Sequence, residues 1–373
     1  MIYDTNPFVY SRPIAPEEII DRDAETRQLL RWAVGGHYVR LYAPRKFGKT
    51  SLLGRVLRDG AAQEGLIPIM VDLYGVLSVA DVAIRIERAY AKQLKGALHK
   101  KIDDFLKSTG IGLSLGAYGV SAKIQTNLNT DPLPALHALL DLPLRLEQEG
   151  GRRALVVFDE FQDVTKVKDM DALLRSHIQY QGEIASYIFS GSEPGMMKKL
   201  FEDKDRPLYG SAVPMKLGLL DDADIAPYII ERFRGSDRDA GDTLQPLLDT
   251  AKGHPQRVIH LAHRLWEEVP QGEAATFEQW QAAHERALLE LHPEFEAAWR
   301  GFGATEQRAL RAVVAGEGKP LRGAVLKQLE IEKNTAFYAL QRLGEAADVE
   351  SRDGTWVIVD PLFAQWIEKL RSP

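Results

Sequence analysis

Five short apolar runs, rich in β-branched residues, constrain the fold more than any other feature of the chain. They cover residues 37–42, 66–73, 154–159, 185–190 and 213–217. Their hydrophobicity is nearly continuous rather than alternating, which is typical of parallel strands buried on both faces. Amphipathic segments such as 78–94 lie between them. This alternation predicts a doubly wound α/β domain over residues 1–217.

The stretch 105–130 interrupts the alternation of strand and helix. It contains four glycines among small residues: Gly110, Gly112, Gly116 and Gly119. Glycine-rich runs of this kind are typical of bends in hairpins and of loops. We therefore expect an inserted hairpin or a mobile loop here, and both alternatives stay open.

The sequence changes character after residue 217. Strand-like runs stop, and amphipathic segments follow at 221–235, 255–269 and 276–291. A block of helices after a block of strands predicts a second domain, which we place at residues 218–298.

Residues 299–373 predict a third domain. Three helices are expected at 304–316, 321–330 and 334–346, and a ribbon at 347–360 that turns at Asp353 and Gly354. The Asp-Gly pair is a strong signal for a two-residue hairpin turn. Three helices followed by a hairpin make a winged helix-turn-helix.

Length, composition and charge limit the kinds of protein that this chain can be. A chain of 373 residues has room for two or three domains, and its 45% hydrophobic and 27% charged residues are typical of globular proteins. No apolar run reaches the roughly 20 residues of a membrane span, and no signal segment is seen. The lack of cysteine excludes disulfides and thiolate metal sites. We expect a cytoplasmic protein without membrane contact, and the net charge of −6 argues against a chain devoted to nucleic acid.

The first apolar run leads directly into the stretch 43-APRKFGKTS-51. It matches the phosphate-binding pattern G-x-x-x-x-G-K-[ST] except at the first position, which is Ala43. Backbone N–H groups of such a loop, and of the helix after it, point at phosphate oxygens. Lys49 is expected to reach the β and γ phosphates, Thr50 to ligate Mg²⁺, and Gly48 to let the backbone approach the phosphate. The expected binding residues are Pro44, Arg45, Lys46, Phe47, Gly48, Lys49, Thr50 and Ser51.

The missing first glycine is a small obstacle to this interpretation. Its position lies at the exit of a strand, where small size matters more than a positive φ, and alanine is small. A solvated basic turn between a strand and a helix is the alternative for the whole stretch. The GKTS core between a strand and a helix favours the phosphate site.

Two adjacent acids, Asp159 and Glu160, end the third apolar run. Ionised carboxylates at the end of a buried strand are costly unless they bind something. We expect Asp159 to hold Mg²⁺ through water, and Glu160 to orient and polarise the attacking water. A pair that caps a helix at the junction of strand and loop is the alternative.

The fourth apolar run ends in polar residues, among them Ser190 and Ser192. Ligands bind outside the carboxyl ends of parallel strands, so these serines belong to the same edge as Lys49 and Asp159. One of them is expected to contact the γ phosphate or position the water. Either serine could equally cap the helix that starts near Pro194, so both interpretations stay open.

Seven segments spread over nearly the whole chain resemble a known family. They are EIIDRDAE at 18–25, PRKFGKTSLL at 44–53, VVFDEFQDV at 156–164, FSGSEPGMM at 189–197, PLYGSAVPMKLGLL at 207–220, GHPQRVIHLAHRLW at 253–266 and WVIVDPLFAQWI at 356–367. On these segments the chain resembles the archaeal-type ATPase family of the AAA+ superfamily, which is related to the STAND signal-transduction ATPases. The DEFQ tetrapeptide and the terminal VDPLF-x-x-W are specific in combination.

The resemblance implies a P-loop NTPase core with three αβα layers and a parallel sheet, an all-α lid and a C-terminal winged helix. It implies ATP or ADP and Mg²⁺ as ligands, and ATP hydrolysis as the activity. By similarity, Gly253, His254 and Pro255 form a lid motif near the nucleotide phosphates, and Arg22 lies by the adenine pocket. Gly-His-Pro is also an ordinary turn before a helix that starts with proline.

One departure from the family matters. Where relatives often carry Tyr-Gly-Arg, this chain has Tyr-Gly-Ser, which ends at Ser211. If that arginine acts on nucleotide, in cis or across a subunit interface, serine cannot replace its charge. Loss of such an arginine costs ~10³–10⁵ in rate. We therefore expect slow turnover or a nucleotide-locked switch, unless Arg206, Arg232 or Arg234 substitutes.

Winged helices often bind DNA, and 334–343 stands in the place of the recognition helix. From Arg300 to Pro373, however, the chain carries 11 basic and 10 acidic residues, which is no electrostatic footprint for a phosphate backbone. We therefore expect a protein partner, self-association or an intramolecular role. The sequence predicts an ATP-hydrolysing conformational switch in which lid and winged helix respond to nucleotide. A nucleotide-regulated DNA-binding protein is the alternative.

Overall fold

The computed structural model describes residues 5–12, 14–109, 115 and 131–370. Most of the predicted glycine-rich insertion lies outside these residues. Residues 105–108 are the last turn of helix α4 (Gly96–Ser108), because Ile102 and Leu106 continue an amphipathic pattern into the core. The prediction that the insertion begins at residue 105 is therefore wrong at this end.

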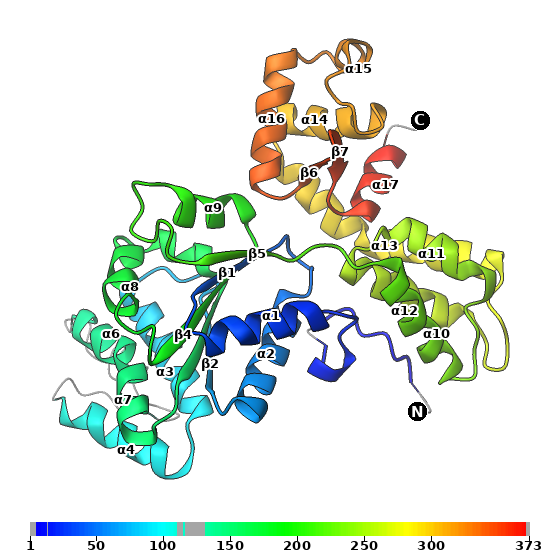
Figure 1. The fold of residues 1–373 in the computed structure, drawn as a ribbon. Coiled ribbons are helices and arrows are strands. Elements are labelled where there is room, and N and C mark those ends of the chain that lie inside the picture. Colours follow the sequence, from blue (N-terminus) through cyan, green and yellow to red (C-terminus); the bar gives the residue numbers. More distant parts are fainter. Residues whose placement is uncertain (1–4, 13, 110–114, 116–130, 371–373) are drawn as a thin grey trace.

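A five-stranded sheet forms the centre of the α/β part (Figure 1). Its strands are β1 (Val39–Tyr42), β2 (Ile67–Asp72), β3 (Ala154–Asp159), β4 (Ala185–Gly191) and β5 (Val213–Lys216). Their order is β2-β3-β4-β1-β5, and all neighbours are parallel. Each strand falls on one of the five apolar runs, which confirms the predicted parallel sheet. β3 and β4 are buried along their whole length, as their continuous hydrophobicity predicts.

The register brings the carboxyl ends of the central strands together at one edge of the sheet. Tyr42 at the end of β1 pairs with Gly191 at the end of β4. Phe158, next to the end of β3, pairs with Phe189 of β4. The loops that follow these three strands therefore start side by side.

Helices cover both faces of the sheet and give the predicted three αβα layers (Figure 1). One face carries α1 (Asp23–Val34) and α2 (Lys49–Gln63). The other carries α3 (Val79–Gln93), α4, α6 (Leu133–Leu140), α7 (Leu142–Gly150), α8 (Met170–Ile178) and α9 (Pro194–Glu202). Successive residues of β3 point to opposite faces: Val156 packs in the second layer and Val157 in the first.

The helical part that follows the sheet comprises α10 (Asp222–Arg234), α11 (Leu244–Ala251), α12 (Pro255–Glu268) and α13 (Phe277–Gly301). Three of these helices fall on the predicted amphipathic segments. A capping box between Thr276 and Gln279 starts α13. This helix contains Pro293 and runs through the predicted domain boundary at 298–299.

The C-terminal part contains α14 (Ala304–Ala315), α15 (Gly323–Gln328), α16 (Lys333–Glu345), the hairpin β6 (Val349–Arg352) and β7 (Thr355–Ile358), and α17 (Pro361–Lys369). The first five elements have the order that a winged helix requires. Asp353 and Gly354 have φ of 49° and 78°, the left-handed pair of a tight hairpin turn. α17 was not predicted; the Asp360 carboxylate caps it by accepting the N–H groups of Leu362 and Phe363 at 3.1 and 3.3 Å.

One hydrophobic cluster joins α10–α13, the C-terminal elements and the start of the chain. It includes the fully buried Phe8, whose carbonyl accepts a hydrogen bond from the His263 ring at 2.7 Å. The helical and C-terminal parts therefore pack as one body beside the sheet. The N-terminal segment leads from this body through the short 3-10 helix η1 (Pro16–Glu18) to α1.

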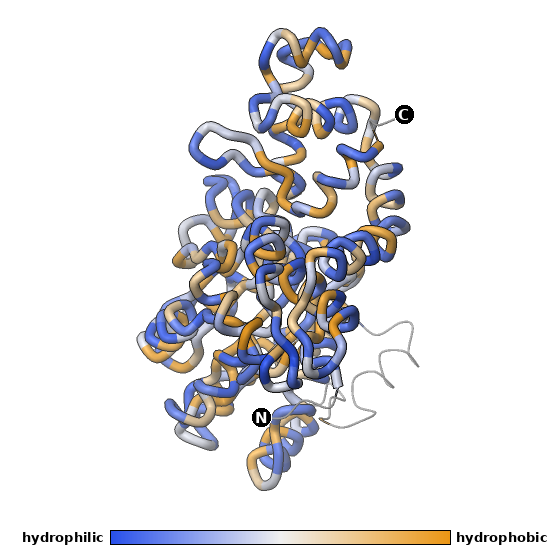
Figure 2. The backbone as a smooth tube through the Cα atoms, turned by 90° about the vertical axis from the view of Figure 1, so that its right-hand side faces the viewer, coloured by the Kyte–Doolittle hydropathy of each residue, from blue (hydrophilic) through white to orange (hydrophobic). Residues whose placement is uncertain are grey.

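Along the described chain, polar and apolar positions are interleaved (Figure 2). None of the helices within the described ranges is both long enough and apolar enough to cross a lipid bilayer.

Candidate functional site

The loop predicted to bind phosphate, here called the phosphate loop, spans residues 43–48, between the end of β1 and the start of α2. Gly48 has φ 83° and ψ 14°, and Lys46 has φ 68°, so two left-handed residues turn the chain into the helix. A Cβ built on Gly48 would meet no atom within 4 Å. The space beside this glycine is therefore open to a ligand.

Ala43 occupies the position of the missing glycine. Its φ is not positive, its side chain is fully buried, and its N–H donates to the carbonyl of Gly191 at 3.3 Å. The methyl group packs into the core between α2 and the sheet. A small side chain therefore fits here, as the sequence predicts.

Lys49 lies at the base of the loop and is 6% exposed. Its ammonium donates to the carbonyls of Ala43 and Pro44 at 2.9 and 3.0 Å. Burial lowers the pKa of Lys49 to about 8, while the nearby carboxylates of Glu160 and Asp159 oppose the shift. Because an ammonium has three N–H groups, one remains for a ligand.

Asp159 ends β3 opposite the first turn of α2. The Thr50 hydroxyl donates to its Oδ2 at 3.2 Å, and the Glu160 N–H donates to its Oδ1 at 3.1 Å. Burial raises the pKa of Asp159, and the negative charge of Glu160 raises it further; the hydroxyl of Ser190 and the ammonium of Lys49 act in the opposite direction. A bound cation would favour the ionised carboxylate.

The chemistry of this donor set fits Mg²⁺. One hydroxyl, from Thr50, and one carboxylate, from Asp159, lie within hydrogen-bond distance of each other. Within the described ranges, no group of three or more His, Cys, Asp or Glu side chains forms a metal cluster. Mg²⁺ commonly takes one or two protein oxygens and completes its shell with water and phosphate oxygens.

Glu160 follows Asp159 in the left-handed conformation, with φ 50° and ψ 43°. Its Oε2 accepts hydrogen bonds from the Ser192 hydroxyl and from Gln162 Nε2, each at 2.5 Å. Ser190 and Ser192 are buried. Neither serine caps α9, whose N-cap is Glu193 without a side-chain bond. The two serines therefore lie with the acids instead of capping the helix.

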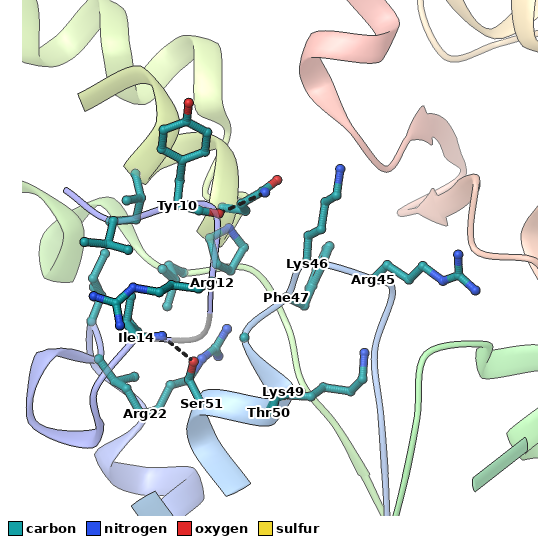
Figure 3. Close-up of a pocket in the computed structure, with 18 of the residues that line it drawn as sticks. Tyr10, Arg12, Ile14, Arg22, Arg45, Lys46, Phe47, Lys49, Thr50 and Ser51 are labelled. Atoms are coloured by element: carbon teal, nitrogen blue, oxygen red, sulfur yellow. Dashed lines mark hydrogen bonds between the residues drawn. The ribbon is translucent and has the colours of Figure 1, made fainter. Parts of the chain in front are cut away.

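A cavity of about 440 Å³ opens beside the loop. Figure 3 shows the loop and the start of α2 on one side and the N-terminal segment on the other. Its charged lining residues are Arg12, Arg22, Arg45, Lys46, Lys49 and Glu160, and its apolar ones are Val9, Ile14, Ile19, Ile20, Phe47, Leu220, Pro255 and Ile259. Five cationic side chains with one acid suit a polyanion, and the apolar wall suits a flat organic group.

Most of the predicted site residues line this cavity: Arg22, Arg45, Lys46, Phe47, Gly48, Lys49, Thr50, Ser51, Glu160 and Pro255. Pro44 belongs to the loop but lines a second cavity instead, and its carbonyl accepts a hydrogen bond from Lys49. Arg22 is 5% exposed and is fixed by hydrogen bonds from its Nη1 to Glu25 at 2.8 Å and from its Nη2 to the Gly218 carbonyl at 2.6 Å.

His254 lies behind the cavity wall. Its ring is 2% exposed and meets Phe47 edge-on at 5.0 Å, and its Nδ1 accepts the N–H of Arg257 at 3.4 Å as the cap of α12. Burial lowers the pKa of His254 to about 4. The neutral ring therefore supports the phosphate loop through Phe47, and direct contact with a phosphate stays a prediction.

This buried ring predicts a loss of stability in acid. The folded state lowers the pKa of His254 from 6.5 to about 4, so the stabilisation from the neutral ring is complete above pH 6.5 and is lost as the pH falls toward 4. The difference corresponds to about 3 kcal/mol. The free energy of unfolding, measured with urea, should fall between pH 7 and pH 4 by about 3 kcal/mol more in wild type than in His254→Asn. Asparagine keeps a capping oxygen without titrating. Equal losses in the two proteins would contradict this role.

The sequence alone did not identify the N-terminal wall of the cavity. Residues 9–14 have no periodicity that marks a binding segment. Only tertiary packing brings Ile14 beside α2, where its N–H donates to the Ser51 hydroxyl at 3.2 Å. Gln162 is a further polar residue of the site. Its place in the sequence, two residues after Glu160 at the end of a buried strand, is a signal that indicates such a role.

No family model and no curated protein sequence matches this chain. Among solved structures, the chain is similar to the Walker-type ATPase PABY2304 of Pyrococcus abyssi, with 20% identity and a TM-score of 0.70 over 96% of this chain and 99% of that one. It is also similar to the Aeropyrum pernix ORC2 protein in its ADPNP-ADP complexes, with 15% identity and a TM-score of 0.61 over 98% and 99% of the two chains. The ADP form of ORC2 gives a TM-score of 0.54 at 15% identity over 97% and 95%. The chain thus has the fold of the AAA+ P-loop ATPases.

Proposed function

We propose that this protein binds ATP with Mg²⁺, hydrolyses it, and changes the position of its helical lid and C-terminal winged helix in response. The observation that carries the proposal is the meeting of Lys49, Thr50, Asp159 and Glu160 at one edge of the sheet, beside a cationic cavity. The ORC2 protein is described in ADPNP-ADP complexes, which supports a nucleotide as the ligand of this fold.

In this proposal the phosphates lie against the N-terminus of α2. Its first N–H groups and the free N–H of Lys49 donate to phosphate oxygens, and the helix dipole favours their charge. Thr50 and Asp159 would hold Mg²⁺, which would supply positive charge to neutralise the phosphates. The base and ribose lie against the apolar wall formed by the N-terminal segment and Pro255.

Glu160 accepts the proton of the attacking water. A bond forms between the water oxygen and the γ phosphorus, and the bond from that phosphorus to the bridging oxygen breaks, leaving ADP and phosphate. Arg206 pairs with Asp171 at 3.2 Å, and Arg232 stacks on Tyr228 at 3.4 Å. Arg206, Arg232 and Arg234 are all absent from the cavity lining. We therefore expect slow turnover by the isolated chain.

Ionic contacts support the response of the lid. Lys46 of the phosphate loop pairs with Glu294 of α13. Glu294 also lies 3.6 Å from Nη2 of Arg257 at the start of α12. Nε of Arg257 donates to both oxygens of Asp360, at 3.0 Å each. A bound phosphate and Glu294 would compete for the ammonium of Lys46. Nucleotide binding would therefore perturb the linked ion pairs from Lys46 through Glu294 and Arg257 to Asp360 in the C-terminal part.

The junction between this body and the sheet leaves room for movement. A cavity of about 600 Å³ separates the phosphate loop from the C-terminal part, lined by Pro44 and Phe47 on one side and by Leu340 and Trp356 on the other. An ion pair between Lys216 and Glu350 bridges the two parts at the surface. Exposed pairs of this kind contribute little to stability, so they do not lock the two parts together.

The C-terminal part is proposed to contact protein, either a partner or a second copy of the chain. On α16 the aromatic side chains of Phe337 and Tyr338 are 41% and 64% exposed. Exposed aromatic rings on a helix suit a protein contact better than a phosphate backbone. DNA binding therefore has no specific observation in its favour.

Replacing Lys49 with alanine tests the proposed site. A buried charge-assisted hydrogen bond contributes about 1.5–3 kcal/mol, so ATP affinity should fall roughly 10–100-fold. Isothermal titration with ATP and Mg²⁺ measures the change. Lys92→Ala, an exposed lysine on α3, is the control and should bind as wild type does. The proposed site is wrong if Lys49→Ala binds ATP with unchanged affinity.

A further inference from the structure

The side chain of Gln162 is buried beside the proposed catalytic carboxylate. It is 2% exposed and lies in η2 (Phe161–Lys166), directly after the left-handed Glu160. The preceding Phe161 is fully buried, with its ring 4.7 Å from Phe189 and 5.8 Å from Phe201. Because the aromatic packing fixes η2, the amide of Gln162 has a defined position relative to Glu160.

Three side chains form a closed set of hydrogen bonds at this point. Gln162 Nε2 and the Ser192 hydroxyl both donate to Glu160 Oε2 at 2.5 Å, and Gln162 Nε2 lies 3.4 Å from Ser192 Oγ. The two hydrogens of the amide and the one of the hydroxyl account for all three contacts if Glu160 is ionised. The reverse orientation of the amide would place its oxygen against the carboxylate, so the chemistry fixes which atom faces Glu160.

The amide oxygen of Gln162, Oε1, is a buried acceptor without a hydrogen-bond donor among the described residues. A Cβ at Gly191 would lie 2.8 Å from it, so the oxygen is confined against the end of β4. Burying an acceptor without a donor destabilises a fold. An apolar side chain of similar length would avoid this cost, so packing alone does not explain the amide.

We propose that Gln162 is a positioning residue that, together with Ser192, holds the Glu160 carboxylate toward the attacking water. The inference rests on the proposed hydrolysis of ATP. Two donors on Oε2 stop the carboxylate from rotating, and Oε1 accepts no hydrogen bond from the described residues. Since Glu160 lines the cavity, Oε1 is the oxygen that takes the proton of water.

The variant Gln162→Met tests this role, because methionine fills a similar volume without the amide. We expect kcat to fall about 10–100-fold, as for small displacements of catalytic groups. The dissociation constant for ATP should stay within about twofold, and the melting temperature should not fall, because the unpaired oxygen is gone. Ser192→Ala removes the other donor and should lower kcat in the same way, which keeps the test valid if Gln162→Met fails to fold.

Gln181→Met is the matched control. Gln181 is also a buried amide, but it lies before the opposite end of β4, where its Nε2 donates to the Leu140 carbonyl at 3.0 Å and its Oε1 accepts from Tyr187. This variant should melt at a lower temperature with kcat unchanged. If Gln162→Met behaves like Gln181→Met, or weakens ATP binding as much as turnover, the positioning role is overturned. Wild type without ATP hydrolysis would instead overturn the proposed function itself.

Discussion

Glu160→Gln is expected to lower the rate of ATP hydrolysis about 10²–10⁴-fold, the range for loss of a positioned general base. Glutamine has nearly the same shape and can still accept the hydrogen bonds of Ser192 and Gln162 through its carbonyl oxygen. It cannot take a proton from water. ATP affinity should stay within about twofold of wild type, because Lys49, Thr50 and the N-terminus of α2 are untouched. Single-turnover release of phosphate and titration with ATP and Mg²⁺ separate the two effects.

Glu193→Gln is the control for this variant. Glu193 lies at the same edge of the sheet, one residue after Ser192, but outside the cavity lining, and its Oε1 lies 4.0 Å from Nη2 of Arg45. Its replacement should leave turnover unchanged. Equal turnover by wild type and Glu160→Gln would show that another group activates the water.

Asp360→Asn is expected to lower the free energy of unfolding by about 3 kcal/mol. Breaking a buried ion pair leaves an uncompensated charge and costs 3–5 kcal/mol, and the lower end applies because the Asp360 side chain is 22% exposed. Its partner Arg257 is fully buried. Asparagine keeps an oxygen for the cap of α17, so the loss reports on the charge. Urea unfolding measures it.

Two further variants make this result specific. Arg257→Met in the Asp360→Asn background removes the unpaired charge and should recover most of the lost stability. Glu350→Gln breaks the exposed pair with Lys216 and should cost less than about 1 kcal/mol. A loss below about 1 kcal/mol for Asp360→Asn would mean that Glu294 or water compensates Arg257.

The strands could be predicted from the sequence because each is a local pattern. A run such as 154–159 must be buried on both faces wherever it lies, and the polar residues at its end mark the edge where ligands bind. The same logic predicts that Lys49, Thr50, Asp159 and Glu160 lie at one edge of the sheet, where the structure has them. Alanine fits at position 43, as predicted, since this fully buried site demands only a small side chain.

The remaining features depend on contacts between distant segments. The wall formed by residues 9–12, 14, 19 and 20 depends on contacts distant in sequence, since the neighbouring Phe8 is buried in one cluster with helices α10–α13. The Gly-His-Pro motif is the same whether the His254 ring faces a phosphate or packs behind Phe47. Only the tertiary packing places the centre of the His254 ring 5.0 Å from that of Phe47. The pairing of Arg257 with Asp360 spans 103 positions of the chain, and nothing local in either segment indicates it.

Helix α13 is long and contains a proline near its C-terminal end. Its 25 residues extend over about 37 Å, from the helical part into the C-terminal part. Pro293 lacks the N–H that would complete the ladder of the helix, which makes that turn its natural bending point. The next residue, Glu294, holds Lys46 of the phosphate loop. If nucleotide binds as proposed, phosphate that draws Lys46 away from Glu294 would act directly beside the turn where α13 bends most easily.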